Sequence, residues 1–532
     1  WREEQSALIT YHSPLITNKH VLIKVFGAAV QGIDATLITI EVNSSRGCMF
    51  YLVGLPDSAV KESHQRIISA LQVNGYRIPT SNIIINMAPA DIRKEGSAYD
   101  LPLAIGMLAA GEVIQPDKLN RYLMMGELSL DGSLQPIKGA LPIAIKAREL
   151  GFEGIIVPRQ NALEAAVVNQ IQVYGVENIK EVIEFFNGKQ ELTPTIVNTR
   201  EEFYAQQSSF DLDFADVKGQ ENVKRALEVA AAGGHNIILI GAPGSGKSML
   251  AKRLPSILPP LSLGESLETT KIHSVAGRLQ NNTGLISKRP FRDPHHTIST
   301  VAMTGGGSYP QPGEISLAHN GILFLDELPE FNRSVLEVLR QPLEDRKITI
   351  SRVKSNVEYP ASFMLVASMN PCPCGYYNHP TKACVCSPGQ VQKYLNRISG
   401  PLLDRIDLQI EVVPVPFEKM SDAHPGEASS IIRERVISAR QIQENRYADI
   451  PGVYCNAQMS SKLLSLYARP DDKGLALLKN AMNRLNLSAR AYDRILKVAR
   501  TIADLENSDL IQPLHLAEAI GYRNLDREDW AG

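Results

Sequence analysis

Hydrophobic and polar residues begin to alternate at Val21, and the pattern predicts an α/β domain. The runs VLIKVFGAAV and ATLITIEV have the period of two that is typical of strands, with a glycine turn between them. FYLVGLP and NIIINMAP predict further strands, separated by a helical pattern from Ser58 to Gln72. LPLAIGMLAA and GALPIAIKAREL predict helices, and YLMMGELSL and GIIVP predict strands. We expect one compact α/β domain over residues 21–189.

A polar stretch rich in Thr and Glu, residues 190–209, predicts a linker to a second unit. Beyond it the runs HNIILI, GILFLDE and SFMLVASM are apolar throughout, which predicts a parallel sheet buried on both faces. We expect this second α/β unit over residues 210–418. Residues 419–532 then show helical patterns such as RAYDRILKVARTIADLE. Residues 1–20 have no clear periodicity and form an unassigned leader.

Composition narrows the class of protein. The 532 residues exceed one ordinary domain, and 44% hydrophobic with 21% charged residues is normal for a soluble protein. A formal net charge of -2 excludes a uniformly basic nucleic-acid coat, although a local basic stripe is compatible with it. No apolar run approaches the ~18 residues of a membrane span, and the first residues lack the apolar core of a signal peptide. We therefore expect a cytoplasmic protein, and six cysteines in a chain of this length argue against a disulfide scaffold.

A glycine-rich motif follows the strand HNIILI and precedes the helical run MLAKRL. Its eight residues are Gly241, Ala242, Pro243, Gly244, Ser245, Gly246, Lys247 and Ser248. Glycines at this spacing let successive backbone N–H groups turn inward around phosphates. Lys247 would bring positive charge to the β- and γ-phosphate oxygens, and Ser248 a hydroxyl ligand for Mg²⁺. The motif predicts a P-loop ATPase that uses ATP and Mg²⁺.

Polar residues at the ends of two apolar strands complete the predicted site. Asp326 and Glu327 follow the strand ILFL, at the sheet edge where open α/β folds bind ligands. We expect Asp326 to hold Mg²⁺ and Glu327 to orient and deprotonate the attacking water. Asn370 ends the strand FMLVASMN and is placed to polarise the same water, or else forms a simple turn.

Two arginines further along the chain are candidates for γ-phosphate contacts. Arg405 in GPLLDRID would serve as an arginine finger that reaches a neighbouring subunit. Arg490 in NLSARAYDR, at the start of a predicted lid helix, would reach the phosphate from within its own subunit. A surface salt bridge is the alternative role for either residue.

Four cysteines lie close together after the strand-end asparagine. Cys372 and Cys374 form one C-x-C pair, and Cys384 and Cys386 form another. Two close thiolate pairs can hold Zn²⁺ in a tetrahedral site, and His379 could replace one ligand. One residue within each pair is tighter than the usual two or more, so structural zinc and reduced thiols both remain open.

The P-loop, the DE strand, the strand-end Asn, LLDRID and a helical region with SAR, in this order, resemble an AAA+ ATPase. More narrowly, VLIKVFGAAVQGIDA, GLPDSAVKES, PFRDPHHTIS and MNPCPCG are similar to its magnesium-chelatase-like branch, from Val21 to Trp530. The resemblance implies a homo-hexameric ring that moves DNA branch points using ATP and supports recombination of incoming single strands during natural transformation. Branched or single-stranded DNA and recombination proteins would then be its partners.

Two insertions in the second unit carry basic residues that suit contacts with a nucleic-acid backbone. KITISRV and VEYPASF predict a hairpin whose turn carries Arg352 and Lys354. The other insertion, residues 277–313, carries Lys288, Arg289, Arg292, His295 and His296. We expect these side chains to face DNA, and a solvated loop is the alternative.

The first domain resembles the Lon protease fold in KEGSAYD and GELSLDGSLQPIKGALPIAIKA. That family uses a serine activated by a lysine, and here the two positions fall on Ala98 and Ile143. Ser97 is adjacent but has no base at the matching place, and Lys138 and Lys146 lie at other offsets. The resemblance therefore implies a catalytically inactive Lon-like domain with a scaffold or DNA-contacting role. The expected architecture is this domain, an AAA+ parallel-sheet core and a helical lid.

Three other functions remain open. A metal-chelatase motor subunit would remodel a partner enzyme, and stimulation of ATP hydrolysis by DNA would argue against it. An ATP-dependent protease would need the missing Ser–Lys pair. A protein unfoldase shares every residue of the ATP site, so only its substrate separates it from a DNA motor.

Overall fold

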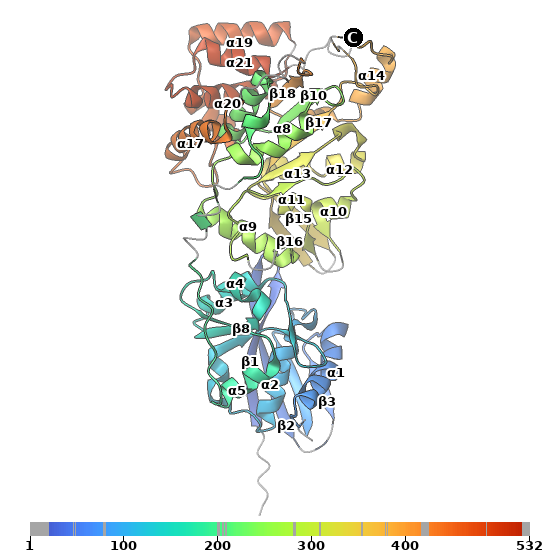
Figure 1. Ribbon diagram of the computed structural model, residues 1–532, viewed down its shortest axis with the longest axis vertical. Coiled ribbons are helices and arrows are strands. Elements are labelled where there is room, and N and C mark those ends of the chain that lie inside the picture. Colours follow the sequence, from blue (N-terminus) through green and yellow to red (C-terminus); the bar gives the residue numbers. More distant parts are fainter. Residues whose placement is uncertain are drawn as a thin grey trace, which may run out of the picture. The chain divides into compact units, whose positions relative to one another are not determined.

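The computed structural model describes residues 21–45, 47, 49–77, 81–198, 203–204, 207, 210–279, 283–307, 310–352, 355–377, 379, 381–416, 425–485 and 487–523. They form two compact units, one mainly up to Val197 and one mainly from Asn198 onward (Figure 1). The predicted leader, residues 1–20, lies outside the described residues.

The first unit is built on a mixed sheet of seven strands. In spatial order these are β3 (Phe50–Val53), β4 (Asn82–Ala88), β2 (Asp34–Ser45), β1 (Val21–Gln31), β5 (Tyr122–Met124), β8 (Gly154–Pro158) and β9 (Gln172–Val176). β1 and β2 pair in antiparallel register from Val21 opposite Ser44 to Gln31 opposite Asp34. The alternating pattern therefore predicted this long hairpin correctly.

Helices of the first unit follow the predicted α/β order. They are α1 (Ser58–Val73), α2 (Asp100–Ala110), α3 (Ala140–Glu149), α4 (Arg159–Ala165) and α5 (Ile179–Phe186). The predicted strand YLMMGELSL is divided into β5 and the short β6 (Glu127–Leu128), which pairs with β7 (Leu134–Gln135). The division occurs because the Gly126 N–H donates to the Ala98 carbonyl at 2.7 Å, away from the sheet.

A parallel sheet of five strands lies at the centre of the second unit. Its spatial order is β11 (Phe291–Arg292), β14 (Ile322–Leu325), β17 (Met364–Met369), β10 (Ile237–Gly241) and β18 (Leu408–Val412). Every residue of β10, β14 and β17 is buried, which confirms the sheet predicted from the continuous apolar runs.

Two further antiparallel pairs complete the strands of this unit. β12 (Gly305–Gly306) pairs with β13 (Gln311–Pro312), and β15 (Lys347–Arg352) pairs with β16 (Ser355–Pro360). The β15–β16 pair is the hairpin predicted from KITISRV and VEYPASF.

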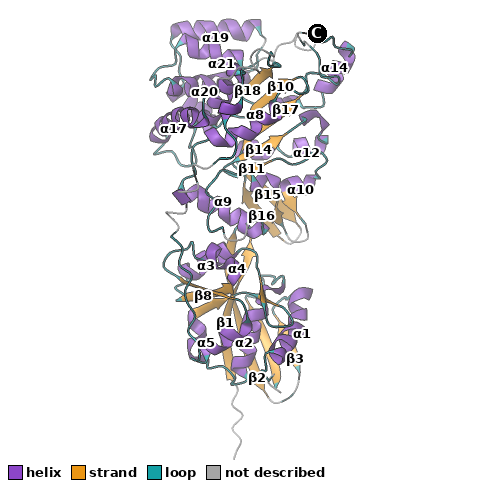
Figure 2. Ribbon diagram, in the orientation of Figure 1, coloured by secondary structure: helices purple, strands orange, loops and turns teal. Residues whose placement is uncertain are grey.

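Helices surround the parallel sheet and form the end of the chain (Figure 2). Around the sheet lie α7 (Glu221–Gly233), α8 (Lys247–Arg253), α9 (Leu263–Ala276), α10 (Thr300–Thr304), α11 (Glu314–Leu317), α12 (Arg333–Glu337), α13 (Arg340–Asp345), α14 (Pro388–Leu395) and α15 (Gly400–Leu403). The helical C-terminal region contains α17 (Ser429–Arg446), α18 (Ser461–Tyr467), α19 (Asp472–Arg484), α20 (Ala489–Leu505) and α21 (Pro513–Gly521). In the described part of the chain, no helix combines the length and the apolar character needed to cross a bilayer.

Candidate nucleotide-binding and hydrolysis site

The P-loop joins β10, the fourth strand of the parallel sheet, to α8. β10 lies between β17 and β18, and α8 begins at Lys247. Gly244 and Gly246 have φ angles of 78° and 93°, in the left-handed region that glycine adopts without a Cβ clash. The glycine spacing therefore gives the turn that aims backbone N–H groups at a phosphate chain.

The ammonium group of Lys247 is surrounded by oxygen atoms. Its Nζ donates to the carbonyl oxygens of Gly241 at 2.7 Å and Ala242 at 3.0 Å, and to Asn370 Oδ1 at 3.1 Å. Burial lowers the pKa of Lys247, and the nearby carboxylates act in the opposite direction. Because this charge is already withdrawn from bulk water, its attraction for a phosphate oxygen is stronger than that of an exposed lysine.

Ser248 and Asp326 bring two oxygen ligands together from different elements. Ser248 lies on α8 and Asp326 follows β14, and Ser248 Oγ donates to Asp326 Oδ2 at 2.7 Å. Hydroxyl and carboxylate oxygens are the ligands that Mg²⁺ prefers in proteins. The donor set therefore fits the ion that the sequence predicts at these residues.

Glu327 has a backbone conformation that is uncommon for a residue with a Cβ. Its φ is 55°, and its N–H donates to Asp326 Oδ1 at 3.1 Å. The side chain is exposed, and Glu327 Oε2 lies 3.9 Å from His296 Nδ1. The turn after β14 thus leaves the carboxylate accessible to a water molecule and to a histidine from another segment.

These residues share one open pocket at the carboxyl end of the sheet. It is lined by Pro243, Gly244, Gly246, Lys247, Ser248, Met249, Asp326, Glu327, Ser368, Met369 and Asn370. The pocket combines the P-loop with the ends of β14 and β17, because adjacent parallel strands end at the same edge of a sheet.

Ser368 belongs to this site although the sequence did not predict it. Its side chain is buried within β17, and its hydroxyl donates to Asp326 Oδ1. The Glu327 N–H also lies 3.5 Å from Ser368 Oγ. A single polar residue two positions before the strand-end Asn370 was the only indication in the sequence.

The segment PFRDPHH supplies two further residues near the site. His296 lies beside Glu327, and Asp293 lies 3.7 Å from Lys252 of α8. Burial raises the pKa of Asp293, which Lys252 opposes and the charge of Asp326 reinforces. From the sequence, His296 is among the basic residues expected to face DNA, and no role is predicted for Asp293.

Arg405 and Arg490 are not among the residues that line the pocket. Arg405 is only 7% exposed, and its guanidinium binds Glu344 and the Pro401 carbonyl. Arg490 has a 66% exposed side chain and pairs with Asp404 at 3.0 Å. Arg405 would have to leave Glu344 to contact a neighbouring subunit, and Arg490 would have to leave Asp404 to reach the phosphate.

Arg352 ends β15 at the tip of the predicted hairpin, where its register partner is Ser355. Lys354, predicted beside it in the turn, lies outside the described residues.

Arg289 is held by partners inside its own unit, and its predicted contact with DNA stays a prediction. Its guanidinium donates to the carbonyl oxygens of Pro259 at 2.7 Å and Asn320 at 2.8 Å, and it pairs with Glu265 at 3.0 Å. An arginine that satisfies three partners in this way orders the loop rather than offering its charge to a ligand.

Arg292 lies on β11 and pairs with Glu314 at 2.5 Å, and its predicted contact with DNA also stays a prediction. Lys288 remains exposed, with its Nζ 5.5 Å from the centre of the Phe210 ring. Of these three basic residues, Lys288 alone keeps an exposed side chain.

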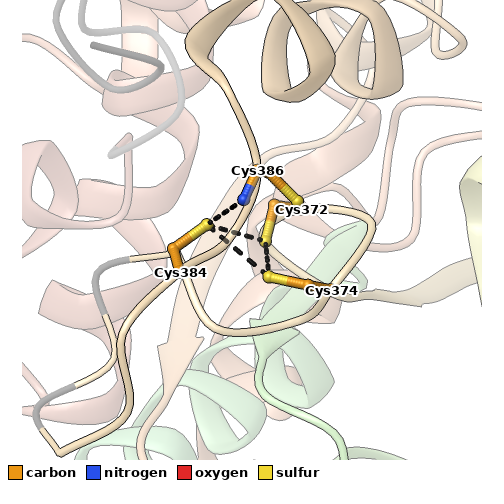
Figure 3. Close-up of side chains that lie close together, drawn as sticks. All are labelled: Cys372, Cys374, Cys384 and Cys386. Carbon is orange, nitrogen blue, oxygen red and sulfur yellow. Dashed lines mark hydrogen bonds between the residues drawn. The ribbon is translucent and has the colours of Figure 1, made fainter.

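The four predicted cysteines form one compact cluster (Figure 3). Cys372 Sγ lies 3.3 Å from Cys374 Sγ and 3.7 Å from Cys384 Sγ, and all four sulfurs lie within 4.8 Å of one another. His379 is outside this cluster, since its Nδ1 accepts the backbone N–H of Lys382 at 3.1 Å. The alternative with a histidine ligand is therefore wrong for this arrangement, and the cluster is a candidate metal site.

In the first unit, contacts around Ala98 and Ile143 do not form a Ser–Lys pair. The Ser97 hydroxyl donates to Glu127, and Ile143 is buried in α3. Lys146 pairs with Glu149 at 3.1 Å. The described contacts therefore pair Ser97 with a carboxylate instead of an amine.

Family models match most of the chain. A model described as "Magnesium chelatase, subunit ChlI" matches residues 213–420. A second, "Subunit ChlI of Mg-chelatase", matches residues 40–161, and a third, for the ChlI C-terminal region, matches residues 426–523.

Similar proteins extend over nearly the full length. Competence protein ComM of Haemophilus influenzae is 44% identical over 507 residues, which cover 94% of this chain and 97% of that protein. The uncharacterized protein YifB of Escherichia coli is also 44% identical, with 94% and 96% covered. Lon protease 2 of Bacillus subtilis is 29% identical over 130 residues, 24% of this chain and 23% of that protein, so likeness to Lon is weak and local.

Proposed function

Because the chain belongs to the magnesium-chelatase-like family of AAA+ ATPases, we propose that it is an ATP-driven DNA motor that moves branch points during recombination of incoming DNA. The observation that carries ATP hydrolysis is the shared pocket of Lys247, Asp326 and Glu327. The step to DNA is supported by the 44% identity to a competence protein and by the hairpin β15–β16, which carries the basic residue Arg352.

Each residue of the pocket has its own role in ATP hydrolysis. Lys247 binds the β- and γ-phosphate oxygens, and Glu327 takes a proton from the attacking water. The water oxygen forms a bond to the γ-phosphorus as the bond to the bridging oxygen breaks, so that ADP and phosphate leave. Asn370 orients the water. Ser248 and Asp326 would hold Mg²⁺, which would supply positive charge to the phosphates.

Arg405 and Arg490 are proposed to act on the same phosphate in an assembled ring. Arg490 reaches it from the lid of its own subunit after releasing Asp404, and Arg405 acts across a subunit boundary after releasing Glu344. The assembly is a homo-hexamer in this proposal. Arg352 at the end of β15, Lys354 in the turn predicted from the sequence, and Lys288 contact the nucleic-acid backbone in this proposal.

The first unit serves as a scaffold without proteolytic activity in this proposal. The Glu127 partner of Ser97 and the buried Ile143 support this view, since neither supplies the lysine amine that would activate a serine. ATP-dependent cleavage of unfolded casein that is lost in Ser97→Ala would refute it.

ATP-driven branch migration on a labelled three-strand or four-way DNA junction tests the main proposal. Lys247→Ala is the control, because it removes the phosphate contact and leaves the DNA surface unchanged. Strand release that needs ATP and disappears in Lys247→Ala supports the motor. ATP hydrolysis at a normal rate without strand release would refute the DNA function, but it would not affect the assignment of the ATP site.

The family models favour one other function, a protein-remodelling motor of the magnesium-chelatase type. The two candidates differ in their response to DNA. A DNA motor increases its rate of ATP hydrolysis when single-stranded or branched DNA is added, whereas a protein-remodelling motor does not.

A further inference from the structure

The cysteine cluster has the geometry of a closed metal site. Three of its sulfur–sulfur distances, 3.3 Å, 3.6 Å and 3.7 Å, are far longer than the ~2.05 Å of a disulfide. A tetrahedron of thiolates at about 2.3 Å from Zn²⁺ has edges of about 3.8 Å, close to these separations. All four cysteines are free thiols, and together they supply four ligands without a carboxylate or histidine.

We propose that Cys372, Cys374, Cys384 and Cys386 bind one Zn²⁺, and that the filled site fixes the shape of the nucleotide pocket. Four sulfur ligands in a tetrahedral arrangement select soft or borderline ions and disfavour Mg²⁺ or Ca²⁺. With four protein ligands the ion has no open position for a water or substrate, so the site is structural.

A backbone N–H group supports one of the sulfurs in the way that is usual around metal-bound thiolates. Cys386 N–H donates to Cys384 Sγ at 3.4 Å. The turn between the first two ligands is closed by the Gly375 N–H, which donates to the Cys372 carbonyl at 2.9 Å. These bonds order the loop around the four sulfurs.

The first pair of cysteines lies against the P-loop. Gly375 has a φ of 83°, and a Cβ at this position would come within 2.4 Å of Pro243 Cδ. Asn370, which binds Lys247 at 3.1 Å, lies two residues before Cys372. Any shift of this turn therefore moves groups that contact both the P-loop and its lysine.

The second pair is linked to the same asparagine through α14. This helix begins directly after Cys386, with Ser387 as its N-cap. The backbone of Asn370 lies beside the hydroxyl of Tyr394, which is buried on α14. The metal would therefore tie together two segments that both adjoin Asn370, one by chain connection and one through the side chain of Tyr394.

Metal content is measured first, by mass spectrometry on the full chain purified without chelator. We expect about one zinc per chain, and much less in Cys384→Ser and Cys386→Ser. Cys455→Ser is the matched control, since Cys455 is a buried free cysteine outside the cluster, and it should keep its zinc. Absence of metal, or iron or copper in place of zinc, in the unsubstituted chain would overturn the zinc site.

The link to the pocket is tested by the affinity for a fluorescent ATP analogue, before and after zinc removal. We expect binding to weaken by about tenfold on removal and to recover when zinc, but not Mg²⁺, is returned. Unchanged affinity would overturn the link while the zinc site stands. This arm rests on the proposed nucleotide site, whereas the metal analysis does not. If the zinc-loaded chain failed to bind the analogue, the nucleotide site would be refuted and the zinc site would be unaffected.

Discussion

His296 Nδ1 lies 3.9 Å from Glu327 Oε2, and the His296 ring packs edge-on against Phe331 at 6.4 Å. The histidine comes from the segment PFRDPHH, while Glu327 follows β14 in a left-handed backbone conformation. Two segments that are distant in the sequence thus meet at the proposed general base. His296 is in place to orient the carboxylate toward or away from the attacking water.

We predict that His296→Ala lowers the kcat of ATP hydrolysis and leaves the KM for ATP nearly unchanged. The phosphate contacts of Lys247 are kept, but Glu327 loses the group that orients it. The loss should be roughly tenfold, smaller than the 10²-fold or more expected when the general base itself is removed. Steady-state kinetics measure both constants.

His295→Ala is the control for this prediction. Its ring bonds to Thr297 Oγ1 at 2.9 Å and stacks beside His296 with ring centres 4.1 Å apart. We expect kcat within a factor of about two of the original value. An equal loss of kcat in His295→Ala and His296→Ala would show that either change disturbs the PFRDPHH segment as a whole.

Ser368→Ala should raise the Mg²⁺ concentration needed for half-maximal hydrolysis. The Ser368 hydroxyl donates to Asp326, and a hydrogen bond to a charged group contributes about 1.5–3 kcal/mol. Without it, Asp326 is less well oriented toward Ser248, so the requirement for Mg²⁺ should rise by about tenfold. Titration of Mg²⁺ at saturating ATP measures this shift.

Ser316→Ala serves as the comparison for that titration, because Ser316 is buried and its hydroxyl has no hydrogen-bond partner among the described residues. Its Mg²⁺ requirement should not change. A Ser368→Ala protein with an unchanged requirement would show that Asp326 is held in place without the serine.

Local patterns were sufficient to predict the parallel core, the P-loop and the β15–β16 hairpin. Each depends on neighbours in sequence, because burial on both faces of a strand leaves a continuous apolar run and a P-loop turn needs closely spaced glycines. The break in YLMMGELSL was missed, since it depends on a hydrogen bond from Gly126 to the distant Ala98.

The partners of charged side chains could not be predicted in the same way. Arg289 and Arg292 were expected to face DNA, yet Glu265 and Glu314 lie 24 and 22 residues away from them in sequence and neutralise them in the fold. Ser368 was missed because a serine in an apolar strand shows no periodicity of its own. Tertiary pairing of this kind becomes visible only when the chain is folded.

Removing positive charge from the turn of the β15–β16 hairpin should weaken binding to DNA equally, whatever the DNA sequence. Arg352→Ala and Lys354→Ala should each reduce the slope of log affinity against log salt concentration by about one. Lys347→Ala is the matched control on the same hairpin, because Lys347 already pairs with Glu358 at 2.9 Å. Fluorescence anisotropy with single-stranded DNA measures the slopes, and unchanged slopes in both tip variants would exclude the hairpin from the DNA surface.

Contacts of His235 predict that the protein loses stability in mild acid. This histidine is fully buried, with Nδ1 3.3 Å from Asp407 Oδ2 and Nε2 2.8 Å from Thr501 Oγ1. Burial lowers the pKa of His235, and Asp407 offsets this only in part. Near pH 6.5 this histidine takes up a proton in the unfolded chain but not in the folded chain. As the pH drops below 6.5, the free energy of unfolding therefore decreases, by at most ~1.4 kcal/mol per pH unit for each such histidine.

Denaturant midpoints between about pH 8 and pH 5 test this prediction in the protein and in His235→Gln. The variant should be less stable at neutral pH, yet its stability should decline less steeply below about pH 6.5. Burial also lowers the pKa of His273, so the stability of His235→Gln should still decline somewhat in acid. Burial lowers the pKa of Lys497 to about 8, so this lysine is charged in both states below that pH and does not affect the slope there. His295→Gln, at an exposed histidine, should follow the original slope. If His235→Gln declined as steeply as the unsubstituted protein, the acid sensitivity would have to come from groups other than this buried histidine.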